Sequence, residues 1–356
     1  MSQIIFQRLI DYAEAGGTTI MNADKGRYIK RESDHDAELM AKAEIIDRRT
    51  ITRQMRAVMF EYEDRRYFAF FGFASIQDQL LQMPEGLREL DATPGLFAIA
   101  VTETGAMIRA TPAEIREIVE GEYRGLKGYE GHDLFAIASL FPPVMFFEAD
   151  VDYTYTANLD RVLGAMVSAT YVDGPFALSE DTLETVAALF TDGSEFIPFD
   201  NVLQGVLSIS WSGFYVELYR CVEQLYPVPR LVDLIQQWSS TQSFGTLADL
   251  LQTSLGWRPR EDESLIKLIA ACPESVSNDL AAAFGILLNE KSSPSEIAGR
   301  QVYAMRNGLV HFRGNSAVGH LSDEKWNAVV KAMIALVTAT YAEFGEKYHQ
   351  GIVTAL

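Results

Sequence analysis

The second half of the chain consists almost entirely of amphipathic helix patterns, and this feature restricts its fold more than any other. From about residue 207 onward, apolar residues recur every three or four positions, as in helices that bury one face. The predicted helices span residues 210–226, 230–238, 246–255, 263–272, 278–288, 292–312 and a last one from about 322. Because such helices bury their apolar stripes against one another, we expect an all-α bundle over residues 206–356.

The first half has a different texture and predicts a mixed α+β domain with antiparallel strands over residues 1–205. Aromatic and β-branched runs flank the polar turn 63–65, which indicates a β-hairpin over 58–73. A second hairpin is predicted over 96–110 around the turn 103–105, and a further strand over 144–157. Helices are predicted over residues 1–15, in the later part of 22–50 after a loop, from Thr111 onward, where Thr111 and Glu114 form a capping-box pattern, and over 180–190.

Length and charge support this division into two domains. A chain of 356 residues is long for a single core. The net charge is −19, and it is uneven: residues 1–205 hold 18 Lys and Arg against 34 Asp and Glu, whereas residues 206–356 hold 12 against 15. An acidic surface repels nucleic acid at long range, so we expect any site for an anionic substrate to lie in the nearly neutral second half.

The cysteine content and the N-terminal sequence indicate a cytoplasmic protein. Only two cysteines occur, Cys221 and Cys272, which argues against a disulfide-rich secreted domain. The N-terminus lacks the pattern of a signal peptide. The sequence has no uninterrupted apolar run long enough to span a membrane, so we expect no membrane span. No Cys/His or carboxylate cluster with metal-ligand spacing appears, so we expect neither a metal nor another cofactor.

One polar group interrupts the apolar pattern of the helix at 292–312. Tyr303, Asn307 and His311 are spaced four residues apart and share a stripe, and Arg306 lies beside it. A guanidinium is a fork-shaped donor suited to phosphate, and an imidazole transfers protons near neutral pH. Arg and His without a metal fit RNA scission, in which the 2′-hydroxyl attacks the adjacent phosphorus. A packing role for this His and Arg is the alternative.

These residues carry a resemblance to a known family. The segment RNGLVH resembles the Arg-Asn-x-x-x-His form of the signature of HEPN domains. The segment FYVELYRCVEQLYP resembles the first helix of HEPN domains in prokaryotic defence proteins, especially the ApeA-like group. The resemblance covers roughly residues 207–346 and does not extend to the first half.

The resemblance implies a metal-independent ribonuclease, of a family that contains many toxins and usually dimerises with two motifs facing each other. Arg306, Asn307 and His311 match the motif and would be the catalytic residues. Four neighbours are candidates for supporting roles that the family pattern does not decide: Tyr303, Arg313, Glu217 and Glu223.

The expected function is therefore RNA cleavage, with tRNA as one candidate substrate, in anti-phage or toxin-type defence. We expect a homodimer or a higher even oligomer formed through the second domain. The acidic first domain would be a regulator that responds to a phage-derived or nucleic-acid activator. The alternative is a non-catalytic HEPN module that serves dimerisation or partner docking.

Overall fold

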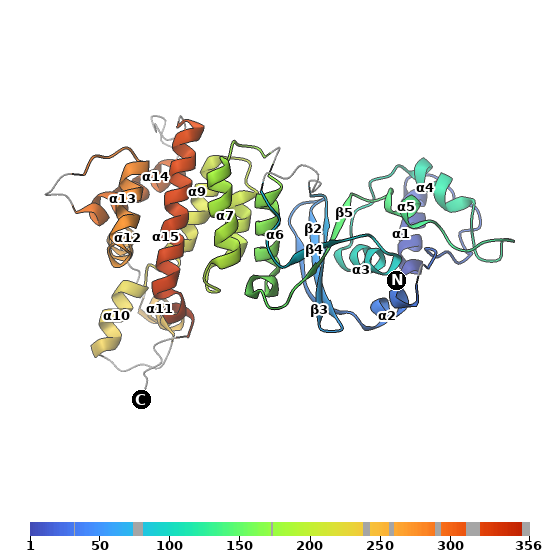
Figure 1. The fold of residues 1–356 in the computed structure, drawn as a ribbon, viewed down its shortest axis with the longest axis horizontal. Helices are drawn as coiled ribbons and strands as arrows, with labels where there is room; N and C mark the ends of the chain where they lie inside the picture. The colour runs from blue at the N-terminus through green and yellow to red at the C-terminus, as the bar shows by residue number, and fades with distance from the viewer. Residues whose placement is uncertain are drawn as a thin grey trace. The chain divides into compact units, whose positions relative to one another are not determined.

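The chain forms two compact units in a computed structural model (Figure 1), which describes residues 1–31, 33–73, 81–171, 174–237, 243–255, 260–288, 293–310 and 321–350. The first unit comprises Met1–Asp78 and Glu85–Leu159, and the second comprises Gln79–Pro84 and Asp160–Leu356. This division falls near residue 159, whereas the sequence placed the boundary at 205. The reason is that three helices ahead of residue 206 pack into the helical unit.

Those three helices are α6 (Leu159–Ala169), α7 (Glu180–Asp192) and α8 (Phe199–Val206). The Arg161 guanidinium of α6 donates to the carbonyls of Phe190 and Thr191 on α7. Helix α8 packs on the helix that follows it, and α7 packs on the last helix of the chain. Only α7 was predicted; α6 and α8 were missed.

The first unit contains an antiparallel sheet, as predicted. Its strands are β1 (Glu44–Thr50), β2 (Arg56–Tyr62), β3 (Arg65–Phe71), β4 (Leu87–Leu90) and β5 (Val144–Ala149), in the order β1-β2-β3-β5-β4. The predicted hairpin over 58–73 is confirmed as β2–β3. Glu63 and Asp64 form its two-residue turn with φ of 50° and 57°, and this left-handed pair matches the twist of the strands.

Strand β1 is the outermost strand on one side of this sheet, and it is poorly buried. Its pairing with β2 shifts register between Ile45 and Asp47, which is the mark of a bulge. Arg48 and Arg49 are half-exposed on it. The sequence interpretation had placed a helix toward the end of 22–50; only α2 (Asp34–Lys42) is helical there.

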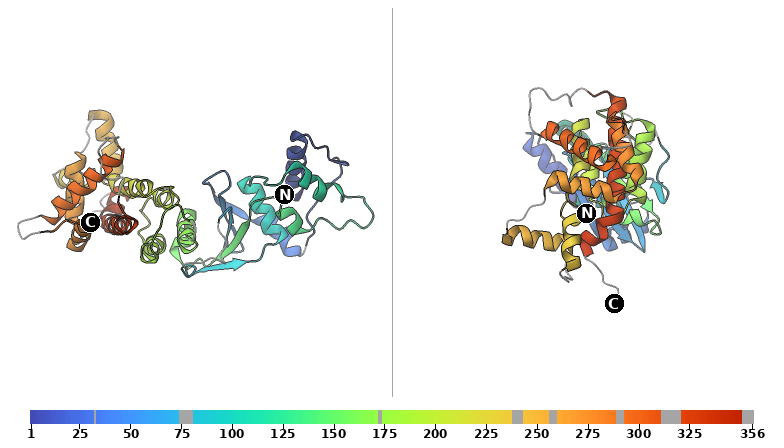
Figure 2. Two further views of the ribbon diagram at one scale, coloured as in Figure 1. Left: turned by 90° about the horizontal axis from the view of Figure 1, so that it is seen from above. Right: turned by 90° about the vertical axis from the view of Figure 1, so that its left-hand side faces the viewer.

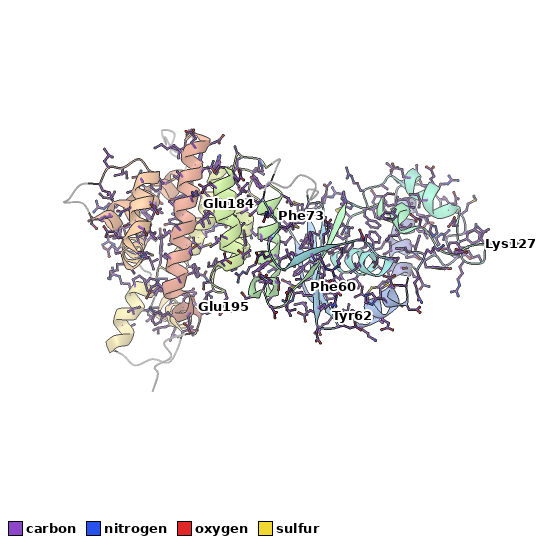
Figure 3. The ribbon with its side chains drawn as sticks, viewed as in Figure 1. Phe60, Tyr62, Phe73, Lys127, Glu184 and Glu195 are labelled. Atoms are coloured by element: carbon purple, nitrogen blue, oxygen red, sulfur yellow. The ribbon has the colours of Figure 1, made fainter. Side chains whose placement is uncertain are left out.

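The helices α1 (Ser2–Ala15), α2, α3 (Pro94–Thr104), α4 (Pro112–Glu120) and α5 (Leu134–Ala138) belong to the same unit (Figures 1 and 2). They share one apolar core with a face of the sheet, in which the larger side chains include Phe6, Leu9, Val58, Phe60, Tyr62, Phe71, Phe97, Ile99 and Phe146. Phe60 and Tyr62 of β2 are labelled in Figure 3. The predicted capping box at Thr111 and Glu114 is present at the start of α4.

The predicted hairpin over 96–110 is wrong, because residues 94–104 form helix α3. Thr93 caps its N-terminus, Pro94 is its first residue, and Gly105 ends it in the left-handed conformation. The helix is buried on almost every side, so its apolar run lacks the 3.6-residue pattern that would distinguish it from a strand. The strand predicted over 144–157 is also shorter than expected: β5 ends at Ala149, and a 3₁₀ turn covers Thr154–Ala157.

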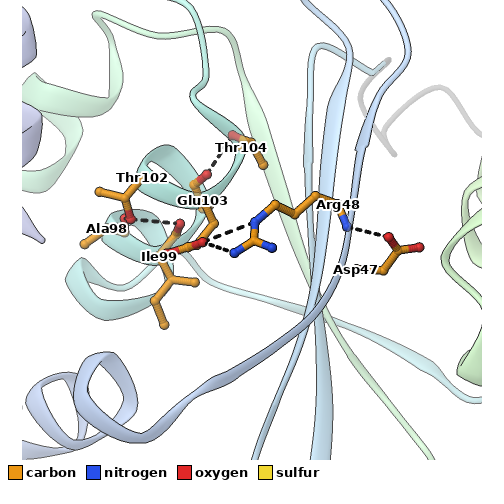
Figure 4. Close-up of polar contacts among 8 residues, drawn as sticks. Asp47, Arg48, Ala98, Ile99, Thr102, Glu103 and Thr104 are labelled. Carbon is orange, nitrogen blue, oxygen red and sulfur yellow. Dashed lines mark hydrogen bonds and ion pairs between the residues drawn. The ribbon is translucent and has the colours of Figure 1, made fainter.

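Three arginines gather at the C-terminus of α3. Arg56 donates to the carbonyl of Thr104 at 2.7 Å, and Arg8 donates to the carbonyls of Val101 and Ala106. Arg48 of β1 pairs with Glu103 (Figure 4). Carbonyls at a helix C-terminus carry partial negative charge, so these guanidinium groups stabilise the helix end and tie it to α1, β1 and β2.

The second unit is helical, as predicted. Its remaining helices are α9 (Trp211–Glu223), α10 (Val228–Gln237), α11 (Phe244–Leu255), α12 (Glu261–Ala271), α13 (Glu274–Ala283), α14 (Pro294–Val310) and α15 (Asp323–Gln350). Helix α15 packs against α7, α9, α10, α11, α12 and α13 (Figures 1 and 2). Among the described helices it alone has the length and apolar composition to cross a membrane, but 61% of its apolar window is buried inside the protein. We therefore interpret α15 as a core helix of the second unit.

Buried tyrosines join α9 to the helices beside it. The Tyr215 hydroxyl donates to the carbonyl of Val302 on α14 at 2.8 Å. The Tyr341 hydroxyl of α15 donates to the carbonyl of Cys221 at 2.9 Å and lies 2.7 Å from Gln224 Oε1. Both hydroxyls are shielded from water, so each bond also satisfies a polar group that burial would otherwise penalise.

We predict that Tyr341→Phe lowers the free energy of unfolding by about 1–3 kcal/mol, because it leaves the carbonyl of Cys221 buried without this partner. The measurement is chemical denaturation of the full chain. Tyr12→Phe is the control, since Tyr12 is 43% exposed and should change stability little. Equal effects of the two substitutions would show that the Tyr341 bond does not hold α15 to α9.

Candidate functional site

Helix α14 begins and packs as its sequence predicts. The Glu296 N–H donates to Ser293 Oγ at 3.4 Å, and Pro294 is the first helical residue. The buried residues of α14 are Ala298, Gly299, Val302 and Met305. The helix is described as far as Val310. Two of the predicted site residues, His311 and Arg313, lie outside the described residues.

Arg306 lies between two other helices rather than at a free surface. Its side chain is only 20% exposed, with one guanidinium nitrogen 3.6 Å from Glu223 Oε1 of α9 and another 4.0 Å from Glu261 Oε2 of α12. The guanidinium carbon lies 5.6 Å from the centre of the Tyr219 ring on α9, within range of a cation–π contact. Arg306 also donates to Asn307 Oδ1 at 3.0 Å. The site thus joins α9, α12 and α14.

Burial governs the ionisation of the α9 side of this site. Burial raises the pKa of Glu223, and the nearby Glu261 raises it further, while Arg306 opposes this rise. The Tyr219 hydroxyl accepts a hydrogen bond from Tyr226, and burial raises the pKa of both phenols. These phenols are therefore neutral at physiological pH and act as hydrogen-bonding groups.

The other predicted supporting residues occupy different positions. Glu217 accepts from Asn201 Nδ2 at 2.9 Å and pairs with Arg220, so it belongs to a separate contact between α8 and α9. Tyr303 is half-buried on α14, one turn ahead of Asn307. The structure therefore brings Arg306, Asn307 and Glu223 together, and it does not bring Glu217 to them.

Sequence reasoning missed two residues of the site, Tyr219 and Glu261. Glu261 is the first residue of α12, one of three acids in its first turn, where acidic residues are common because of the helix dipole. That local explanation hides its contact with Arg306. Tyr219 lies one turn ahead of Glu223 on α9, so the i, i+4 pairing of the two residues was the available signal.

An anion can bind to Arg306 only if it displaces a carboxylate that now pairs with the guanidinium. One guanidinium faces two carboxylates, so a phosphate must compete with Glu223 and Glu261 for the Arg306 donors. Within the described ranges, no three His, Cys, Asp or Glu side chains are placed to share a metal ion.

Comparisons with protein-family models, with curated proteins and with solved structures gave no match.

We predict that Glu223→Gln stabilises the protein more at pH 7 than at pH 4. The pKa of Glu223 is raised in the folded chain, so its ionisation costs stability as pH rises from below the ordinary value of 4.5 through the raised one. Gln removes this cost. The measurement is the melting temperature of both proteins across this pH range. Glu346→Gln, at an exposed position of α15, is the control, and a stabilisation independent of pH would contradict the prediction.

Proposed function

We propose that the chain is a metal-independent endoribonuclease whose second unit acts as a HEPN-type domain. The observation that supports it most is the position of Arg306 and Asn307. They are hydrogen-bonded to each other where three helices meet, and they precede His311 in the motif RNGLVH by five and four residues.

In the proposed reaction the RNA supplies its own nucleophile. The 2′-hydroxyl attacks the adjacent phosphorus, and the bond to the 5′-oxygen of the next nucleotide breaks. His311 takes the proton from the 2′-hydroxyl and delivers it to the leaving 5′-oxygen. Arg306 stabilises the charge on the phosphorane, and Asn307 orients the Arg306 guanidinium through their hydrogen bond. The products are a 2′,3′-cyclic phosphate and a 5′-hydroxyl.

The carboxylates around Arg306 have a part in this proposal. They fix the guanidinium before substrate arrives, because it packs against the Tyr219 ring and bridges α9 and α12. They also discourage weak binding of stray anions. RNA would displace one of them, and Glu223 is the candidate because burial already raises its pKa and disfavours its charged form.

The biological setting follows from the same proposal. We place the enzyme in the cytoplasm, as a defence or toxin-type ribonuclease that acts as a homodimer or higher even oligomer. The acidic first unit would regulate it in response to a phage-derived or nucleic-acid activator, since a constantly active ribonuclease would harm its own cell.

One observation favours a second candidate, a non-catalytic interaction module. Arg306 pairs with carboxylates of two other helices, as expected for a residue that holds three helices together. Overexpression separates the two candidates. A ribonuclease should slow growth, and His311→Ala should restore it. A docking module should be tolerated in both forms.

The decisive experiment is RNA cleavage by the full chain in EDTA, with tRNA and single-stranded RNA as substrates. We predict cleavage that leaves 2′,3′-cyclic phosphate ends. Arg306→Ala and His311→Ala should each lower the rate about a hundredfold or more, because they remove charge stabilisation and proton transfer.

Matched controls lie in the same unit. Arg300→Ala changes an exposed arginine of α14 that pairs with Glu296, and His349→Ala changes an exposed histidine of α15. Both should cleave like the parent chain. Equal cleavage by all variants would contradict the assignment of the site, and activity abolished by EDTA would contradict the mechanism.

A further inference from the structure

A cavity of about 750 Å³ lies in the second unit, away from the residues of the candidate site. It is bounded by the starts of α9 and α15 and by the segment that leads into α7. Its principal side chains are Tyr171, Phe176, Ile209, Trp211, Asp323 and Trp326. None of them takes part in the contacts of Arg306.

Closely packed aromatic rings form part of the wall of this cavity, beside Ser210 and Ser212. The Trp211 and Trp326 rings are parallel, with centroids 6.0 Å apart, and the Phe176 ring lies 4.6 Å from Trp211. All three rings are more than nine-tenths buried, so they form a fixed apolar surface.

Asp323 supplies the only charged side chain among the described lining residues. Its Oδ1 accepts a hydrogen bond from Trp211 Nε1 at 2.9 Å, which holds the carboxylate at the cavity. Its other oxygen has no hydrogen bond within the described part of the chain. A hollow whose only charged lining group is a carboxylate held in place repels anions and favours a positive charge.

Two further lining residues, Tyr171 and Ile209, offer groups that a ligand could contact. Tyr171 is 9% exposed, and its hydroxyl has no hydrogen-bond partner among the described residues. Ile209 is 87% exposed and offers an apolar surface at the mouth of the lining. A ligand with both a polar head and an apolar body would satisfy each of them.

A neighbouring groove adds to the negative field. It has a volume of about 830 Å³, shares Asp323 with the cavity, and is also lined by Glu324 and Asp279. The only lysine in its lining, Lys331, is paired with Asp181. The carboxylates of the groove therefore add to the attraction for cations at the cavity. The lysine in the lining of the groove is already paired, so it does not neutralise Asp323.

We propose that the cavity binds an organic cation, with an ammonium or guanidinium group held by Asp323 and an apolar body against Ile209 and the aromatic walls. This site is independent of the proposed ribonuclease chemistry. The same chemical group occurs in free amines and in lysine or arginine side chains of a partner protein, and the test below distinguishes these sources.

The test is calorimetric titration of the full chain with four probes: choline, its neutral carbon isostere 3,3-dimethylbutan-1-ol, spermidine, and Nα-acetylarginine amide. We expect binding of one or more of the cations and none of the neutral alcohol. Spermidine or choline alone would indicate a free amine, and the arginine derivative alone would indicate a protein side chain.

The key variant is Asp323→Asn, which removes the charge and keeps an oxygen that can accept from Trp211 Nε1. It should weaken cation binding about tenfold, because it removes the negative charge that faces the cation. Glu324→Gln, which lines only the neighbouring groove, should leave the affinity nearly unchanged. Tyr171→Phe, a second variant that keeps the aromatic wall, should also weaken binding, because it removes the unpartnered hydroxyl from the lining.

Three outcomes would overturn the proposal: no binding of any cation at millimolar concentration, measurable binding of the neutral alcohol as tight as that of the cations, or equal affinities of the parent and Asp323→Asn chains. The first two outcomes use only the parent protein, so they decide the matter even where a variant folds poorly.

Discussion

The helical unit depends on the fixed position of α9 between α14 and α15. Two tyrosine hydroxyls set this position, Tyr215 on the carbonyl of Val302 and Tyr341 on the carbonyl of Cys221. Because each bond is buried, sliding α9 along either neighbour would leave polar groups without partners. The same restraint fixes where Tyr219 and Glu223 stand relative to Arg306. Tyr215 and Tyr341 thus help to set the geometry of the candidate site.

In the candidate site the positive charge of Arg306 is already compensated by carboxylates. The Arg306 guanidinium has two carboxylates and an aromatic ring around it, and it is mostly shielded from water. A buried cation without such partners would be strongly disfavoured, so the carboxylates hold the guanidinium in the resting arrangement even though ionisation of Glu223 costs folding stability. They also compete with any phosphate. A site of this kind favours a substrate that makes many further contacts over a small free anion.

The sequence predicted local features well and contacts across the fold poorly. The turn at Glu63 and Asp64, the cap at Thr111 and the start of α14 were all found, because each depends on neighbouring residues. Helix α3 was mistaken for a hairpin because burial on all sides erased its periodicity. Glu261 was missed because its contact with Arg306 joins residues 45 positions apart, and nothing local marks it. The motif RNGLVH was read from sequence alone, and its role is a proposal.

The outer edge of the sheet in the first unit has a consequence for how copies of this chain could meet. An exposed strand edge can pair with the edge of another molecule. On β1, the register shift between Ile45 and Asp47 interrupts the ladder, and the charged side chains of Asp47, Arg48 and Arg49 line the strand. This edge therefore resists joining sheet to sheet. The homodimer proposed above would therefore not use this edge.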